Sequence, residues 1–262
     1  MDFTFQKHKE LLMALHKQDY AFKSFHQYVL EKDHLKHPFI MLRHDVEKHY
    51  AHALKFAEIQ HDLGIVGTYF FRILPQCFRP EIVSQIAQLG HEVGYHYDDL
   101  SVCKGDYKKA IVRFTKNLNT LRSLAPVKTI CMDGSPLSKY DNKDLWQAGK
   151  YAYADFDLLG EPYFDVDFDK VLYLTDTGRR WDGWKTSVRD KVPQQEDWIK
   201  QGYDFHSSDD IIAFLKQEKK SPREKNISIM LTFHPQRWTT GGLPWIKEWV
   251  WQNTKNQIKA LI

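Results

Sequence analysis

Short apolar segments alternate with longer segments of helical spacing along much of the sequence, and this alternation constrains the fold more than any other feature. Four apolar segments have the length of a strand: 39–46, 66–72, 91–97 and 127–132. The segments between them have apolar residues at helical spacing: 49–63, 80–89 and 106–124. Strands joined by helices in this way form parallel sheets with right-handed crossovers. The sequence therefore predicts an α/β protein, either a barrel or a doubly wound sheet.

The alternation is less regular after Pro136. The elements expected there are short strands at 163–166 and 171–175, a helix at 209–219 that begins near Asp209, a strand at 226–233 and a terminal helix at 244–262. Residues 5–32 have a mostly helical pattern with a break near Asp19. We expect one domain over residues 1–262, in which residues 1–36 form a helical addition packed across the sheet.

Composition narrows the class of protein. The 262 residues are 27% charged with a mean hydropathy of −0.55, and no stretch approaches the roughly 18 to 20 apolar residues of a membrane span. The first residues lack the layout of a secretory signal, so we expect a cytoplasmic protein. The net charge is +3 and the basic residues are scattered, which gives little reason to expect nucleic acid or membrane as a partner. Eight Trp and thirteen Tyr would suit stacking on sugar rings, although such residues more commonly pack in cores.

Three predicted strands end in side chains that can carry chemistry. Asp45 and Glu47 lie at the end of the first apolar segment, His96 lies near the end of the third, and His234 follows the strand at 226–233. Because the carboxyl ends of parallel strands meet at one rim, we expect these groups to converge. Together they suit a metal that activates water, a carboxylate base and an imidazole acid. Taken singly, a histidine at a strand end is more commonly structural, and an Asp-x-Glu pair is often a solvated helix start.

These motifs resemble those of the polysaccharide deacetylase family, which shares the NodB homology domain and is also called carbohydrate esterase family 4. The resemblance covers most of residues 38–237. Residues 42–47, Leu-Arg-His-Asp-Val-Glu, resemble the family's first motif, a strand ending in two acids, with one residue inserted between the acids. Residues 90–96 resemble its Gly-His-Glu-Ile-Gly-x-His motif, and residues 231–234 resemble its Leu-x-His strand end. The resemblance implies a distorted (β/α) barrel.

The resemblance also implies roles for four residues. Asp45 would be the catalytic base and His234 the general acid. Glu47 and His96 would bind a divalent metal, with zinc expected and manganese or magnesium as alternatives. The family's second histidine ligand, four residues after the first, is replaced here by Leu100.

Other residues would have to complete the metal site and the substrate site. The nearest carboxylates are Asp98 and Asp99, and Asp133 at the end of the fourth strand is another; we assign Asp99 and Asp133 as ligands. Asp133 and the Gly-Ser-Pro after it occupy the region where the family places an arginine that orients the base, so Arg43 or Arg72 would have to take over that role. Residues 175–182 resemble the family's tryptophan-containing wall segment, with a solvated turn as the other interpretation. Four residues are expected to contact substrate: Tyr97, Arg179, Trp181 and Trp238.

The implied reaction is the metal-dependent hydrolysis of an acetyl group on a sugar. The expected substrate is a surface-glycan or polysaccharide precursor, such as a nucleotide sugar or a lipid-linked unit. An inactive barrel that binds a glycan is the alternative, and Leu100 favours it; the presence of both a base and an acid argues against it. A metal-dependent enzyme of other chemistry is a third hypothesis, because a fold does not determine a function. The sequence indicates no oligomeric state.

Overall fold

The structure is a computed structural model that describes residues 1–18, 20–35, 37–147, 149–181, 187, 189–218 and 227–260, with backbone only for 255–260. Its seven strands are β1 Ala21–Lys23, β2 Phe39–Val46, β3 Thr68–Phe71, β4 Glu92–Tyr97, β5 Ile130–Met132, β6 Val171–Thr175 and β7 Ser228–Phe233. All of the pairings between these strands are parallel, in the order β5-β4-β3-β2-β7-β6, and β1 pairs with β2.

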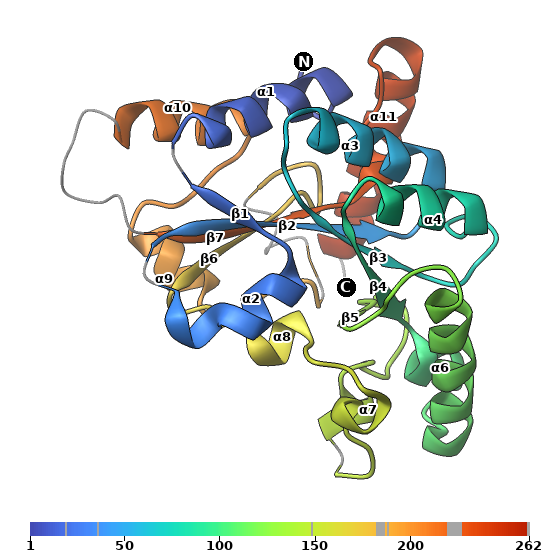
Figure 1. Ribbon diagram of the computed structural model, residues 1–262. Helices are drawn as coiled ribbons and strands as arrows, with labels where there is room; N and C mark the ends of the chain where they lie inside the picture. Colours follow the sequence, from blue (N-terminus) through green and yellow to red (C-terminus); the bar gives the residue numbers. More distant parts are fainter. Residues whose placement is uncertain are drawn as a thin grey trace.

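Helices surround this sheet (Figure 1). The α-helices are α1 Phe5–His16, α2 Phe25–Glu31, α3 Tyr50–Asp62, α4 Pro80–Gln88, α5 Asp99–Val102, α6 Tyr107–Arg122, α7 Asp144–Gln147, α8 Pro162–Asp165, α9 Gln195–Lys200, α10 Ser208–Glu218 and α11 Gly242–Ala260. Short 3-10 turns are η1 Lys32–His34, η2 Tyr153–Phe156 and η4 Pro235–Arg237. The end strands β5 and β6 do not pair with each other within the described residues, so the sheet curls without closing. The predicted α/β distorted barrel is confirmed.

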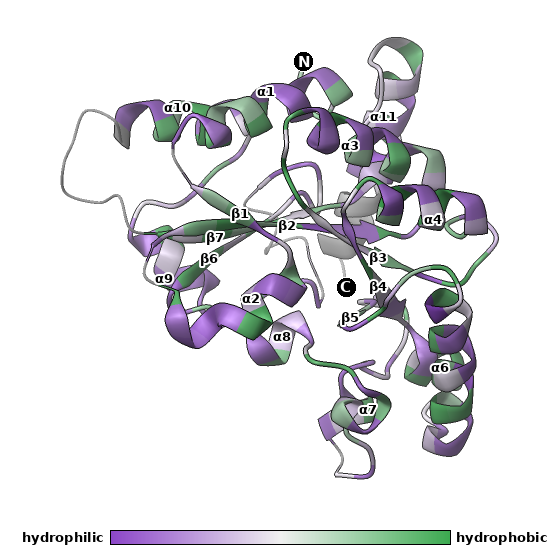
Figure 2. Cartoon of the chain, in the orientation of Figure 1, coloured by the Kyte–Doolittle hydropathy of each residue, from purple (hydrophilic) through white to green (hydrophobic). Residues whose placement is uncertain are grey.

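Strand β2 explains how the barrel directs its side chains. All eight of its residues are buried, as expected for a parallel strand covered on both faces. Ile40 and Leu42 belong to the core beneath the helices, whereas Phe39 and Met41 belong to a second core inside the barrel. Because successive side chains of a strand point to opposite faces, residues 43 and 45 point into the barrel with Phe39 and Met41. Figure 2 shows hydrophobic residues along the central strands and mixed colours along the helices.

Several sequence-based boundaries need correction. Residues 163–166 were expected to be a strand, but Pro162–Asp165 form helix α8, where Pro162 suits the first turn and the Glu161 side chain accepts from the backbone N–H of Tyr163. The N-terminal segment is not only helical, because β1 joins the sheet beside β2. The short helices α5, α7 and α9 were not predicted. The expected break at Asp19, the strand start at Asn226 and the helix end at 261–262 lie outside the described residues.

Within the part of the chain that the structure describes, no helix is both long enough and apolar enough to cross a membrane.

Candidate active site

The carboxylate of Asp45 is held by an arginine of its own strand. Arg43 precedes it by two residues, so both side chains point into the barrel. The guanidinium donates from Nε to Oδ1 over 2.9 Å and from Nη2 to Oδ2 over 2.7 Å. Both side chains are about 2–3% exposed, and the Tyr163 ring lies 5.0 Å from the guanidinium carbon. This two-point contact fixes the orientation of Asp45. Of the two arginines that the sequence offered, Arg43 and Arg72, it is therefore Arg43 that holds this carboxylate.

A cluster of possible metal ligands lies beside Asp45. One ligand atom each from Glu47, His96 and Asp133 lies within 4.8 Å of the other two. His96 Nδ1 lies 3.0 Å from the Cys131 carbonyl oxygen, which can only accept, so Nδ1 carries the proton. His96 Nε2 is buried and has no hydrogen-bond partner in the described part of the chain, and in a neutral imidazole with its proton on Nδ1 this nitrogen would offer a lone pair. A buried imidazole nitrogen in this state is suited to a metal ion.

The other ligands of this cluster differ in how they are held. Asp133 lies 3.2 Å from Arg72 Nη1 and accepts from both the backbone and the hydroxyl of Ser135. Although burial opposes it, His96 and Arg72 lower the pKa of Asp133, so this carboxyl is ionised at neutral pH. Glu47 is more exposed and accepts from Gln236 Nε2 over 2.8 Å. A second group of possible ligands shares His96 and adds Asp45 and Cys131.

His234 faces the same space from the end of β7. Its Nδ1 lies 2.6 Å from Asp176 Oδ1, and its Nε2 lies 4.0 Å from Asp45 Oδ2 and 3.8 Å from Glu47 Oε1. Burial and the charge of Arg237 lower the pKa of His234, but Asp176 and Glu47 together outweigh them and raise it above the ordinary value. The imidazole therefore tends to hold a proton that its Nε2 could donate into the cavity.

Sequence reasoning did not single out Asp176 or Asp190. Asp176 follows strand β6 directly, so the rule that polar residues after strands line one rim could have identified it. Asp190 accepts from the hydroxyls of four residues and lies 3.9 Å from Arg43; the four are Tyr163, Tyr173, Thr175 and Thr177. Despite burial, Arg43 keeps the pKa of Asp190 well below its usual range. No motif in the sequence marks Asp190.

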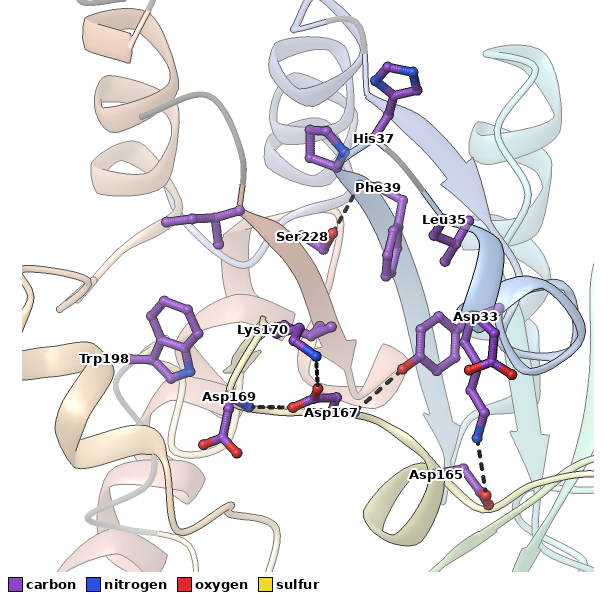
Figure 3. Close-up of a pocket in the computed structure, with 15 residues that line it drawn as sticks. Asp33, Leu35, His37, Phe39, Asp165, Asp167, Asp169, Lys170, Trp198 and Ser228 are labelled. Atoms are coloured by element: carbon purple, nitrogen blue, oxygen red, sulfur yellow. Dashed lines mark hydrogen bonds and ion pairs between the residues drawn. The ribbon is translucent and has the colours of Figure 1, made fainter. Parts of the chain in front are cut away.

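Most of these groups line a cavity of about 460 Å³, although Asp133 and Asp176 are not among its lining residues. Among its lining residues are Arg43, Asp45, Glu47, His96, Tyr163, Arg189, Asp190, His234 and Gln252. A larger cavity, about 740 Å³, opens where β2, β6 and β7 begin, and none of the predicted site residues lines it. Figure 3 shows Asp165, Asp167 and Asp169 in that cavity, with Lys170 paired to Asp167. Since ligands of parallel sheets bind at the carboxyl ends of strands, the smaller cavity is the candidate active site.

Asp99 does not reach this cavity. It begins helix α5 instead of extending strand β4, so its carboxylate points toward α6. It accepts from the Tyr95 hydroxyl over 2.8 Å and from Arg113 Nη1 over 2.5 Å, and it is fully buried. Burial raises the pKa of Asp99 to about 7. The expected ligand role of Asp99 does not agree with this placement. Leu100 is buried in the core.

The four expected substrate contacts also lie outside the cavity lining. Tyr97, Trp181 and Trp238 have no exposed surface, because they pack in the core. Trp238 has a different use, since its Nε1 donates to Asp176 Oδ2 over 2.7 Å. Arg179 is buried between the rings of Phe3 and Trp245. Of the loop at 175–182, Asp182 lies outside the described residues. The aromatic and polar groups that do line the cavity include Tyr163 and Arg189.

Comparison with known proteins gives fold likenesses only. No family model matches the sequence, and neither does any curated protein. Among solved structures, a CE4 family pseudoenzyme from Bacillus anthracis is 12% identical with a TM-score of 0.46, over 86% of this chain and 63% of that one. A family 4 carbohydrate esterase from Streptomyces lividans, solved with acetate, is 13% identical with a TM-score of 0.40, over 85% and 90%. The peptidoglycan deacetylase PdaC from Bacillus subtilis, as its D285S mutant, is 11% identical with a TM-score of 0.37, over 86% and 98%.

This chain thus spans less than two thirds of the pseudoenzyme's length. TM-scores below 0.5 are too low to assign the chemistry of this chain, so its function must be argued from its own residues.

Proposed function

We propose that the chain is a metal-dependent hydrolase that removes an acetyl group from a sugar of a surface-glycan or polysaccharide precursor. One observation carries the proposal. The unpartnered Nε2 of His96 lies beside Glu47 and Asp133, in the same cavity as the Asp45 carboxylate and the His234 imidazole. A base, an acid and a set of metal ligands in one cavity are the parts that metal-assisted hydrolysis requires.

Glu47, His96 and Asp133 fit a divalent cation. One imidazole nitrogen and two carboxylates suit zinc, and the oxygen-rich set also suits manganese or magnesium. When bound, such a metal polarises the acetyl carbonyl and lowers the pKa of a water molecule.

The protein's own residues would then move the protons. Asp45, oriented by Arg43, accepts the proton of the attacking water. His234 protonates the leaving nitrogen or oxygen from Nε2, because Asp176 holds its other nitrogen. General acid and base catalysis of this kind contributes about a hundredfold to ten-thousandfold each.

The cavity also supports a carbohydrate substrate. Its volume falls within the usual range for small-ligand sites. Its lining includes one aromatic residue, Tyr163, and the polar residues Arg189 and Asp190.

An inactive barrel that binds a glycan is the second candidate, and two observations favour it. Leu100 is buried where the resemblance would place a ligand, and Arg72 already neutralises Asp133 over 3.2 Å. Both would weaken a metal site.

Metal analysis together with acetate release separates the two candidates. We expect about one equivalent of metal in protein purified without chelator, and acetate release from acetylated sugars that stops when the metal is removed.

Asp45→Asn should keep the metal and lose acetate release, whereas His96→Ala should lose both. Asp99→Asn is the matched control, a buried acid outside the cluster, and should keep its metal. Less than a tenth of an equivalent with no acetate released would rule out the hydrolase, and equal metal loss in D45N and H96A would contradict the assigned roles.

A further inference from the structure

A second set of possible metal ligands lies beside the first set and is more deeply buried. Its members are Asp45, His96 and Cys131, and one ligand atom of each lies within 4.8 Å of the other two. All three residues are buried, whereas Glu47 of the first set is partly exposed. The side chain of Cys131 has no exposed surface. The second set also differs in its chemistry, because it contains a sulfur ligand.

The sheet places these three side chains on one face. His96 of β4 and Cys131 of β5 are partners in the register of two neighbouring strands (Figure 1). Asp45 of β2 is the partner of Phe70, which in turn is the partner of Gly94. Gly94 lies two residues before His96, and side chains two residues apart in a strand share a face. Asp45, His96 and Cys131 therefore all point into the barrel.

His96 offers this second set an unused nitrogen. Its Nε2 is buried without a hydrogen-bond partner in the described residues, and it lies 3.9 Å from Asp45 Oδ2. The ligand atoms of a tetrahedral zinc ion, with bonds of about 2.0–2.3 Å, lie about 3.3–3.8 Å apart, so these two atoms are close to that spacing. Asp45 can bind a metal while Arg43 holds it, because each carboxylate oxygen has a second lone pair.

Cys131 has a thiol that no strong interaction occupies. Its Sγ donates only over 3.7 Å, to the Met132 carbonyl oxygen, and a thiol is a weak donor. The charged groups that act on this thiol include one arginine and three acids. Surroundings with more acids than bases favour a cation at this point.

We propose that Asp45, His96 and Cys131 form an inner metal position that takes a thiophilic divalent cation such as zinc. On binding, the S–H bond of Cys131 breaks, its proton passes to solvent, and a sulfur–metal bond forms with no change of oxidation state. Manganese and magnesium prefer oxygen ligands, so they would take the outer position of Glu47, His96 and Asp133. Because the single lone pair of His96 Nε2 serves both positions, only one ion binds at a time.

The inner position would regulate the proposed hydrolase. Asp45 cannot accept the proton of the attacking water while it binds a metal. Hydrolysis supported by manganese or magnesium at the outer position would therefore stop when zinc fills the inner position. This consequence rests on the proposed function, whereas the inner position itself rests on the three side chains alone.

Cobalt(II) tests the inner position with the full chain, because a cobalt–thiolate bond gives a charge-transfer band in the near ultraviolet. We expect this band in wild-type protein that is free of metal and kept reduced, and we expect zinc to abolish it by displacing cobalt. The double variant Cys77→Ser/Cys103→Ser is the matched control and should keep the band, since Cys131 is then the only thiol in the chain. Cys131→Ser should remove the band and lower the affinity for zinc by about tenfold or more, with a smaller change for manganese.

Cys131→Ala should give the same result as Cys131→Ser, and thermal unfolding checks that both variants fold. If neither folds, the double variant still decides, because its band can come from Cys131 alone. An absence of the band in the wild type would overturn the inner position. A band that Cys77→Ser/Cys103→Ser loses, or one that both Cys131 variants retain, would overturn it as well.

Acetate release separates the inner position from the proposed function. Added zinc should stop the release that manganese supports in the wild type, and the ratio of zinc-supported to manganese-supported release should rise in Cys131→Ser. No acetate with any metal, together with the thiolate band, would contradict the proposed function and leave the inner position standing. Acetate release that zinc fully supports, without the band, would contradict the inner position and leave the hydrolase standing.

Discussion

Asp45 and His234 are each held by a charged side chain that orients them. Arg43 fixes both carboxylate oxygens of Asp45, and Asp176 fixes the protonated nitrogen of His234. Sequence reasoning found Asp45 and His234 because strand ends predict a common rim. It did not find Asp176, because the resemblance in that loop was carried by a tryptophan that turned out to be buried.

Asp176→Asn tests this dependence. The amide cannot hold the His234 Nδ1–H as a carboxylate does, so His234 would lose its orientation and its bias toward the protonated form. Given the proposed function, kcat for acetate release should fall about a hundredfold or more, while the bound metal stays near one equivalent. An unchanged kcat would show that His234 acts without Asp176.

Asp99 should give the protein a pH-dependent stability. Burial raises its folded pKa to about 7 from 3.8, so the folded state keeps a proton that the unfolded chain releases above about pH 4. The free energy of unfolding should therefore fall as pH rises from about 4 to 7 and level off above it. The free energy of unfolding should decrease by up to about 4 kcal/mol, because each unit of pKa shift corresponds to about 1.36 kcal/mol.

The Asp99→Asn variant isolates this effect in urea titrations at several pH values. The free energy of unfolding of the wild type minus that of the variant should decrease steadily between pH 4 and 7, because aspartate titrates in this range and asparagine does not. A difference that is constant across this range would show that Asp99 is ionised throughout in the folded state.

At the scale of single elements, β4 positions His96 through its packing. Gly94 lies on this strand between β3 and β5, and a Cβ built on it would lie 2.4 Å from the Phe70 ring and 3.0 Å from the Thr129 carbonyl oxygen. The sequence motif contained this glycine, but only the pairing of β4 with its neighbours shows why a side chain does not fit there. The short helices α5 and α8 escaped prediction because single turns leave little periodicity to read.

Gly94→Ala should therefore destabilise the protein by about 1–3 kcal/mol, since the added methyl group overpacks the barrel interior. Gly134→Ala is the control, because its Cβ would come no closer than 3.7 Å to Arg189 Cβ. Chemical denaturation of both variants measures the difference. Equal stability of the two would show that β4 can shift without cost.

At the scale of the whole molecule, the N-terminal segment is part of the barrel. Strand β1 pairs with Phe39–Met41 of β2, and the backbone N–H of Phe25 donates to Thr68 Oγ1 over 2.8 Å. Leu11, Leu12 and Leu15 of α1 are fully buried in the main core. A helical addition packed across a finished sheet would not contribute a strand to that sheet.

A chain that begins at residue 37 should fail to fold cooperatively. It would expose the apolar surface beneath α1 and leave the first half of β2 without its β1 partner. Near-ultraviolet circular dichroism and urea unfolding of residues 37–262 would show this as lost tertiary signal and a broad transition. A sharp transition at the wild-type midpoint would show that residues 1–36 are dispensable.

The sequence by itself determined the order of the main strands and helices, because the spacing of apolar residues within a short segment distinguishes a strand from a helix. It also located the rim of the barrel, since polar residues at the carboxyl ends of buried parallel strands lie together at one edge of the sheet. Only the tertiary structure decided which acids meet. Asp133 joins Glu47 and His96 while Asp99 turns toward α6, because side-chain direction depends on where a strand gives way to a helix. Likewise, the exposure of Leu243, Ile246 and Val250 on α11 became visible only once this helix was placed against the rest of the protein.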